Sequence, residues 1–128
     1  MLSDDVINEV VNRVKRVANP QKIILFGSYA RGRATSESDL DLLVISESEL
    51  PRYKRAAPIY QALSDMLYPM DILVYSSSEV HEWSQVPQAF VTTAMREGKV
   101  LYEKKHDLVQ LWLRKAESDL ARTIHTFL

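Results

Sequence analysis

Three short apolar runs constrain the fold more than any other feature of this sequence. They cover residues 23–26 (IILF), 40–45 (LDLLVI) and 70–75 (MDILVY). Runs of this length, bounded by turn residues, are typical of buried strands rather than helices. Segments with helical periodicity separate them, and this alternation predicts an α/β domain with a small mixed central sheet and helices packed on it. The pattern does not give the strand order.

The remaining elements are predicted from periodicity and from the residues that begin and end helices. Ser3 is a good N-cap for a first amphipathic helix that ends at Asn19-Pro20. A second long helix should use Ile59, Leu63, Met66 and Leu67 as its apolar face, with Pro58 in its first turn. The other predicted elements are a short helix over 29–34, a loop over 35–38, a helix starting near 79, a helix over 88–97 ending at Gly98, and an edge strand over 99–102.

The last segment, residues 105–128, has an apolar stripe at helical spacing and predicts a C-terminal amphipathic helix. We therefore divide the chain into a domain over 1–104 and a C-terminal helix over 105–128. That stripe packs on its own domain, on a second copy of the chain, or on another protein, so a homo-oligomer is one of its possible uses.

Charge and composition exclude several classes of function. The formal net charge of −1 gives no bulk attraction to nucleic acid or to an anionic membrane, and the chain has no cysteine. No stretch approaches the roughly 20 apolar residues that span a bilayer. We expect a cytoplasmic protein with no membrane association.

Three aspartates are the candidate catalytic and metal-binding residues. Asp39 and Asp41 are two residues apart at the start of a predicted strand, so their side chains project from the same face. Asp71 begins the next predicted strand and joins them if the two strands are neighbours. A hard divalent cation removes the repulsion between such carboxylates, and Mg²⁺ favours carboxylates plus substrate phosphate. Asp71 could bind the metal or accept a proton from an attacking hydroxyl.

Gly27 and Ser28, which close the first strand, are the candidate nucleotide-binding residues together with Arg31. A glycine lets the backbone approach a triphosphate, and a serine offers hydroxyl and amide donors near the start of a helix. Alone, each of these residues has an ordinary structural explanation: a tight turn, a solvated arginine or a loop aspartate. Their combined spacing, with ten residues between Ser28 and Asp39, is much more specific.

Gly27-Ser28, the ten-residue gap, Asp39-Leu40-Asp41 and the later Asp71 together resemble the DNA polymerase beta-like nucleotidyltransferase superfamily. The form Gly-Ser-Tyr-Ala-Arg-Gly is most similar to the minimal nucleotidyltransferase (MNT) domain, the antitoxin of MNT–HEPN toxin–antitoxin systems. The resemblance covers about residues 6–102. It implies two Mg²⁺ ions and transfer of AMP from ATP to a hydroxyl, often a tyrosine of a HEPN toxin, without a nucleic-acid template.

The C-terminal segment has a resemblance of its own. Leu111-Trp112-Leu113, with Ala116, Asp119 and Leu120, resembles the opening helix of a HEPN domain. Arg122 and His125 are too close together for the ribonuclease motif of that family, so a ribonuclease would be a partner or a missing C-terminal portion. Two alternatives stay open: an antitoxin that masks its partner without catalysis, and a nucleotidyltransferase acting on a small molecule such as an aminoglycoside.

Overall fold

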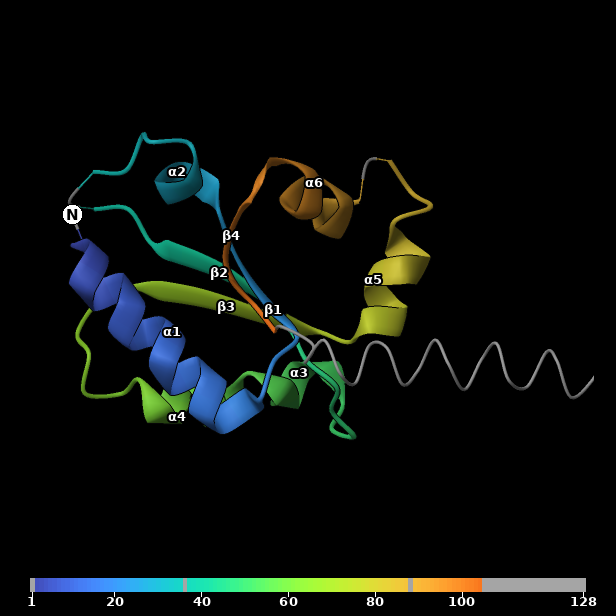
Figure 1. Ribbon diagram of the computed structural model, residues 1–128, viewed down its shortest axis with the longest axis horizontal. Helices are drawn as coiled ribbons and strands as arrows, with labels where there is room; N and C mark the ends of the chain where they lie inside the picture. Colours follow the sequence, from blue (N-terminus) through green and yellow to red (C-terminus); the bar gives the residue numbers. More distant parts are fainter. Residues whose placement is uncertain (1, 36, 88, 105–128) are drawn as a thin grey trace, which may run out of the picture.

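The computed structural model describes residues 2–35, 37–87 and 89–104, which form a four-stranded mixed sheet with helices on both faces (Figure 1). The strands are β1 (Lys22–Phe26), β2 (Leu40–Ile45), β3 (Met70–Tyr75) and β4 (Lys99–Glu103). Their order is β3-β2-β1-β4, with β1 antiparallel to β2 and β4, and β2 parallel to β3. The predicted α/β class and the mixed sheet are confirmed.

The central strand β2 explains why its sequence reads as an almost unbroken apolar run. Every residue of β2 is buried except Asp41, which is partly buried. Leu40, Leu42 and Val44 face the core on one side of the sheet, whereas Leu43 and Ile45 face the core on the other. A strand covered on both faces needs apolar residues at successive positions, because neither face meets water.

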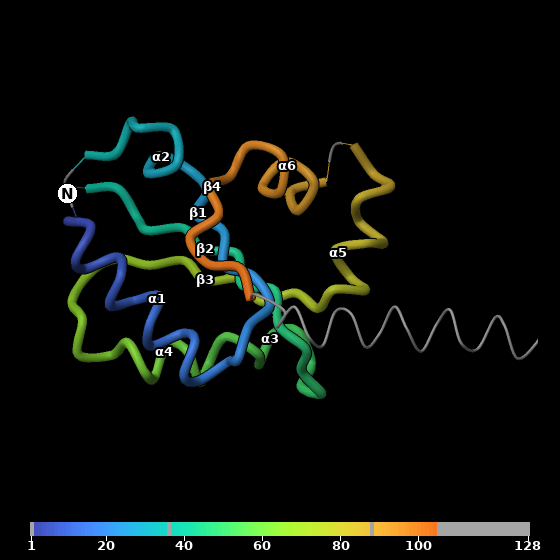
Figure 2. Tube along the Cα trace, in the orientation of Figure 1, coloured from blue at the N-terminus to red at the C-terminus, as the bar shows by residue number. Residues whose placement is uncertain are grey.

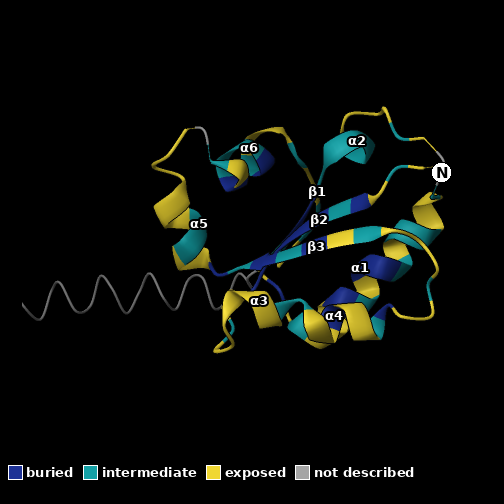
Figure 3. Ribbon diagram, turned by 180° about the vertical axis from the view of Figure 1, so that it is seen from behind, coloured by how far each residue is buried: buried dark blue, intermediate teal, exposed yellow. Residues whose placement is uncertain are grey.

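One face of the sheet is covered by α1 (Asp4–Ala18) and α4 (Ala57–Ala62), as the tube view also shows (Figure 2). The Oγ of Ser3 accepts a hydrogen bond from the Val6 amide at 3.3 Å and begins α1 as predicted. Asn19 ends the helix in the left-handed conformation. Seen from behind and coloured by burial, α1 turns its buried stripe toward the strands (Figure 3).

The opposite face carries α5 (Ser77–Trp83) and α6 (Phe90–Glu97). The short helix α2 (Gly27–Ala30) follows β1 at the end of the sheet, where its Tyr29 and Ala30 pack against the core on the α1 side. Val91 and Ala94 of α6 pack against Ile24 and Leu43 of the sheet. A capping box, in which Ser76 and Glu79 bond to each other's backbone amides, starts α5. This second, smaller core fixes α6 beside α2, where the candidate site lies.

The predicted second long helix is wrong. The structure has two short helices instead, α3 (Arg52–Arg55) and α4, and Leu67 is 91% exposed rather than part of an apolar face. After Ala62 the backbone tightens into i to i+3 hydrogen bonds, from Leu63 to Tyr60 and from Ser64 to Gln61, which end α4. Pro69 further disfavours a helical conformation at Tyr68, just before β3. Pro58 does lie in the first turn of α4, as predicted.

The short helix predicted over 29–34 begins earlier, as α2 at Gly27. Gly98 ends α6 as predicted, but its φ of −76° shows that close packing against Ala94 and Ile24, not a left-handed backbone, requires a glycine there. The predicted helix over 105–128 lies outside the described residues, so the division at residue 104 stays a prediction. Within the described part of the chain, no helix is long and apolar enough to span a membrane.

Candidate active site

Asp41 and Asp71 stand side by side at the start of two parallel strands. They are register partners in the β2–β3 ladder, where neighbouring strands lie about 4.8 Å apart. Side chains alternate along a strand, so Asp41 shares the face of Leu43 and Asp71 shares the face of Leu73, both of which pack in the core on the α6 side. The sheet therefore brings these two predicted site residues together at one end of one face.

Asp39 lies two residues before Asp41, just ahead of β2, and is exposed. The three carboxylates affect one another electrostatically. Partial burial raises the pKa of the Asp41 carboxyl, and the negative charges of Asp71 and Asp39 raise it further. No ion pair neutralises any of the three aspartates among the residues that the structure describes. The cluster is a concentration of uncompensated negative charge.

Gly27 lies directly against this cluster. Phe26, the last residue of β1, is the register partner of Asp41, so the turn at Gly27 passes over the carboxylate. Gly27 adopts a φ of +72°, and a Cβ added there would lie 2.3 Å from Oδ2 of Asp41. Two features require glycine at this position: the backbone is left-handed, and a side chain would displace the Asp41 carboxylate.

The other two predicted nucleotide-binding residues lie on or next to the same turn. Ser28 is the second residue of α2, which has only four residues, so the amides at its start lack helical partners and are free to donate. Arg31 follows α2, but its Nη2 is 3.5 Å from Oε2 of Glu97 in α6, and both side chains are about half exposed. Arg31 therefore bridges α2 to α6 rather than reaching the aspartates.

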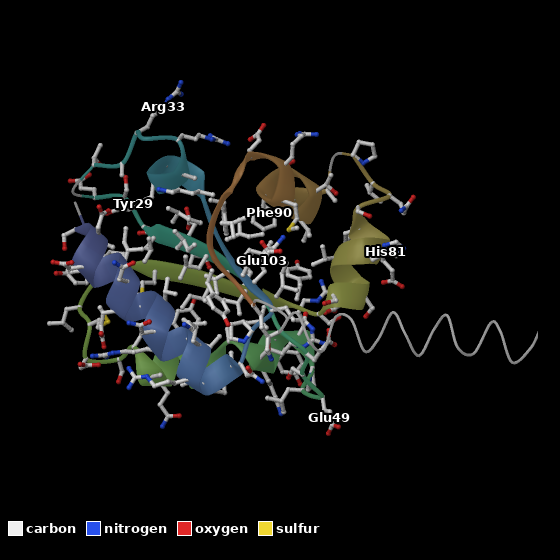
Figure 4. The ribbon with its side chains drawn as sticks, viewed as in Figure 1. Tyr29, Arg33, Glu49, His81, Phe90 and Glu103 are labelled. Carbon is white, nitrogen blue, oxygen red and sulfur yellow. The ribbon has the colours of Figure 1, made fainter. Side chains whose placement is uncertain are left out.

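A cavity of about 140 Å³ lies between α2 and α6, next to Gly27. Phe26 and Phe90 both line it and contact each other edge to face, with ring centroids 4.9 Å apart and an interplanar angle of 75°. Figure 4 labels Phe90 in the space between the two helices. A more open hollow of about 400 Å³, which includes Lys22 and Glu103 in its lining, contains none of the predicted site residues.

Sequence reasoning missed Phe90 and Glu97 as parts of this region. Neither belongs to a motif: Phe90 is one apolar residue at the start of a predicted helix, and Glu97 is one charged residue at its end. Their relation to Gly27 and Arg31 depends on how α6 packs, which no local pattern in the sequence encodes.

The carboxylates fit a hard divalent cation in their chemistry. Oxygen donors with uncompensated charge are the ligands that Mg²⁺ prefers, and it commonly uses one or two carboxylates together with substrate phosphates. Within residues 2–35, 37–87 and 89–104, no three His, Cys, Asp or Glu side chains converge closely enough to hold one ion by themselves. A metal here would use one or two of the three carboxylates and draw its remaining ligands from substrate phosphate and water.

The family profile described as "Polymerase beta, Nucleotidyltransferase" matches residues 8–107, which include all of these site residues. The chain belongs to the polymerase beta nucleotidyltransferase family. A relative from Methanocaldococcus jannaschii, named "Putative protein adenylyltransferase", is 30% identical over 106 residues, which cover 80% of this chain and 100% of that protein. A second protein of that organism with the same descriptive name is 42% identical over 53 residues, 41% of this chain and 52% of its own length.

Solved structures of nucleotidyltransferases and toxin–antitoxin pairs share this fold. A "putative nucleotidyltransferase" from Sulfolobus solfataricus superposes with a TM-score of 0.55 at 18% identity, covering 78% of this chain and 79% of the other. A mutant of the toxin–antitoxin pair MntA–HpeT gives a TM-score of 0.51 at 20% identity over 100% of both chains. A toxin–antitoxin structure with AMP-PNP gives 0.50 at 20% identity, over 94% of this chain and 98% of that chain.

Proposed function

We propose that this nucleotidyltransferase transfers AMP from ATP to a protein hydroxyl with the aid of Mg²⁺, and that it acts in the cytoplasm. The observation that carries the proposal is the Asp41–Asp71 pair, in register on adjacent strands and covered by the Gly27 turn. The amides of the turn can donate to phosphate oxygens, and the carboxylates beside it can bind a metal ion, so the arrangement suits a metal-bound triphosphate.

Each site residue has a proposed role. Asp39 and Asp41 would bind Mg²⁺, which neutralises the phosphate charge and favours in-line displacement at phosphorus when it is bound. Gly27 and Ser28 would hold the phosphates through their amides, and Ser28 also through its hydroxyl. Arg31 would leave its ion pair with Glu97 and bind a phosphate oxygen instead. Asp71 would orient the acceptor, either as a further metal ligand or as the base that takes its proton.

The reaction forms one bond and breaks one. The acceptor oxygen attacks the α-phosphorus of ATP, the bond from that phosphorus to the bridging oxygen breaks, and pyrophosphate leaves. The acceptor proton passes to Asp71 or to water. Partial burial and then the charges of Asp71 and Asp39 raise the pKa of the Asp41 carboxyl, and a cation bound at the cluster would favour its ionised form.

The proposed acceptor is a tyrosine of a HEPN toxin, with this chain as its antitoxin. This finer assignment draws on the toxin–antitoxin neighbours of the fold and on the protein adenylyltransferase names of the relatives. A domain of this size has little surface for a template, so synthesis on nucleic acid is not part of the proposal. The masking antitoxin and the small-molecule enzyme are outcomes that the experiment must separate from it.

The test combines the protein with Mg²⁺, α-labelled ATP and a co-encoded HEPN partner, and follows both labelling and complex formation. We expect the partner to gain AMP, and Asp41→Asn to lose at least about 100-fold in rate because a metal ligand is removed. Glu49→Gln removes the same charge from an exposed residue beyond the far end of β2 from Asp41 (Figure 4) and should label normally. A stable complex without transfer by the unaltered protein would overturn the proposal in favour of masking, and labelling of an aminoglycoside instead would favour the small-molecule enzyme.

A further inference from the structure

Tyr53 is the most exposed tyrosine of the chain, at 81%. Tyrosine side chains are usually packed over part of their ring, so this exposure is high. Tyr68 and Tyr60 follow at 45% and 41%, and the Tyr60 hydroxyl already accepts a hydrogen bond from the Ile72 amide at 2.7 Å. A hydroxyl that is to enter the active site of another molecule must do so without breaking packed contacts. Tyr53 meets this condition best among the tyrosines.

Tyr53 belongs to α3, which lies at the end of the sheet away from the carboxylate cluster. The guanidinium of Arg52 lies over the ring of Tyr75, the last residue of β3, at 4.9 Å from its centroid. Asp71 is four residues earlier on the same strand, about 13 Å away at the usual rise of a strand. Figure 1 likewise shows α3 near the end of β3 that leads to α5. Tyr53 therefore meets a carboxylate cluster only on a second copy of the chain.

The side chains next to Tyr53 carry the charge opposite to that of the carboxylate cluster. Arg52 and Lys54 flank it in the sequence and are exposed, and the Lys54 ammonium lies 5.7 Å from the centroid of the Tyr53 ring. Arg52 pairs with Glu79 at 3.3 Å, whereas no ion pair engages Lys54 within the described part of the chain. The complementarity is local to the tyrosine, because the loop over 47–49 carries two glutamates.

This local complementarity persists when the active site is loaded. The metal ions at most neutralise the triphosphate, so the aspartates leave the loaded site negative. A tyrosine that arrives between two cations therefore meets attraction there rather than repulsion.

We propose that Tyr53 is an acceptor of AMP, modified by the active site of a second copy of this chain. The proposal rests on the proposed nucleotidyl transfer and adds a modification site to it. The Tyr53 oxygen attacks the α-phosphorus of ATP held by the other copy, the bond from that phosphorus to the bridging oxygen breaks, and pyrophosphate leaves. The phenol proton passes to Asp71 of that copy or to water. The product is a phosphodiester whose negative charge lies beside Lys54.

The experiment incubates the full chain with Mg²⁺ and α-labelled ATP, without a partner protein, and locates the label by peptide mass spectrometry. We expect AMP on Tyr53 and no labelling of Tyr53→Phe. Tyr68→Phe is the matched control, because it removes the hydroxyl of the next most exposed tyrosine and should leave labelling unchanged. The labelled fraction per unit time should rise with protein concentration, since the step needs two copies.

A mixing experiment separates transfer between copies from transfer within one copy. Asp41→Asn keeps the acceptor but should lack transfer, whereas Tyr53→Phe keeps the active site but lacks the acceptor. Neither variant should be labelled alone, and together they should give label at Tyr53 of the Asp41→Asn chain. Adding Lys54→Glu to that chain should slow its labelling roughly three- to tenfold, because repulsion replaces attraction at the contact, and Lys54→Arg should not.

The outcomes distinguish this proposal from the one on which it rests. If the same preparation labels a HEPN partner but leaves Tyr53 unlabelled, or labels Tyr68 instead, modification at Tyr53 is wrong and the proposed nucleotidyl transfer stands. A labelling rate independent of protein concentration would overturn transfer between copies. If neither the partner nor Tyr53 gains AMP, the proposed nucleotidyl transfer fails, and modification of Tyr53 fails with it.

Discussion

Replacing Gly27 by alanine tests the close approach between the turn and the carboxylate. The new Cβ would lie 2.3 Å from Oδ2 of Asp41, whereas ordinary contacts of this kind begin at 3.4 Å. The carboxylate or the turn must therefore move by about 1 Å. A displacement of that size in a catalytic group commonly costs about 100-fold in rate, so we expect Gly27→Ala to lose nucleotidyl transfer by at least that factor.

The chain provides a control for the backbone penalty. Gly32 also has a positive φ, +67°, but a Cβ added there would meet nothing within 4 Å. Both substitutions hold an alanine in the left-handed backbone region, which destabilises the folded state by about 1–2 kcal/mol. For a domain of this size that corresponds to a fall in Tm of roughly 4–8 °C. Only Gly27→Ala moves the Asp41 carboxylate.

The assay is labelled AMP transfer at a temperature well below both melting transitions, together with thermal unfolding of each variant. We expect similar losses of Tm and widely different rates, with Gly32→Ala close to the unaltered protein. Equal rates in the two variants would refute the reasoning, since the turn could then move away from Asp41 without harm to the site.

Two further predictions concern stability. Although partial burial opposes it, hydrogen bonds from the Ser76 amide and from Arg55 lower the pKa of Glu79 from 4.5 to about 2. Because the folded pKa is the lower one, Glu79 stabilises the fold above about pH 4.5, and its contribution of about 2–3 kcal/mol is lost as pH falls toward 2. Denaturant titrations should show a smaller loss over this range in Glu79→Gln, and an unchanged pH profile would contradict the assignment. Tyr60→Phe removes the hydroxyl that accepts from the Ile72 amide at 2.7 Å on the edge strand β3, so we expect a loss of about 1 kcal/mol and faster exchange of that amide; unaltered exchange would show that the bond is absent in solution.

The strands were accessible from sequence because they depend on local patterns. Buried strands in this sheet need apolar residues on both faces, and this need appears in the sequence as short unbroken runs over 40–45 and 70–75. Both strands have the bounds that their sequences predict. The spacing of Asp39 and Asp41 likewise predicts a common face without knowledge of the fold.

The parts that sequence could not give depend on long-range packing. Nothing in the local sequence says that β3 lies beside β2 rather than at the other edge, yet this order is what brings Asp71 to Asp41. Leu67 was predicted to be part of an apolar helix face because the helical spacing of apolar residues continues to position 67. In the structure α4 ends at Ala62, and Leu67 is exposed on the way back to β3. The pairing of Arg31 with Glu97 required the position of α6.

Because β2 and β3 pair side by side, the distance between the Asp41 and Asp71 carboxylates does not depend on the length of chain that connects the two strands. The connection from β2 to β3 passes through α4, on the α1 side of the sheet, whereas Asp41 and Asp71 face the α6 side. Ladder hydrogen bonds alone set the distance between the two aspartates. The exposed start of this connection, residues 47–51, can therefore change in length and sequence to alter the outer surface, while Ile59 and Leu63 still cover the sheet and the two carboxylates stay neighbours.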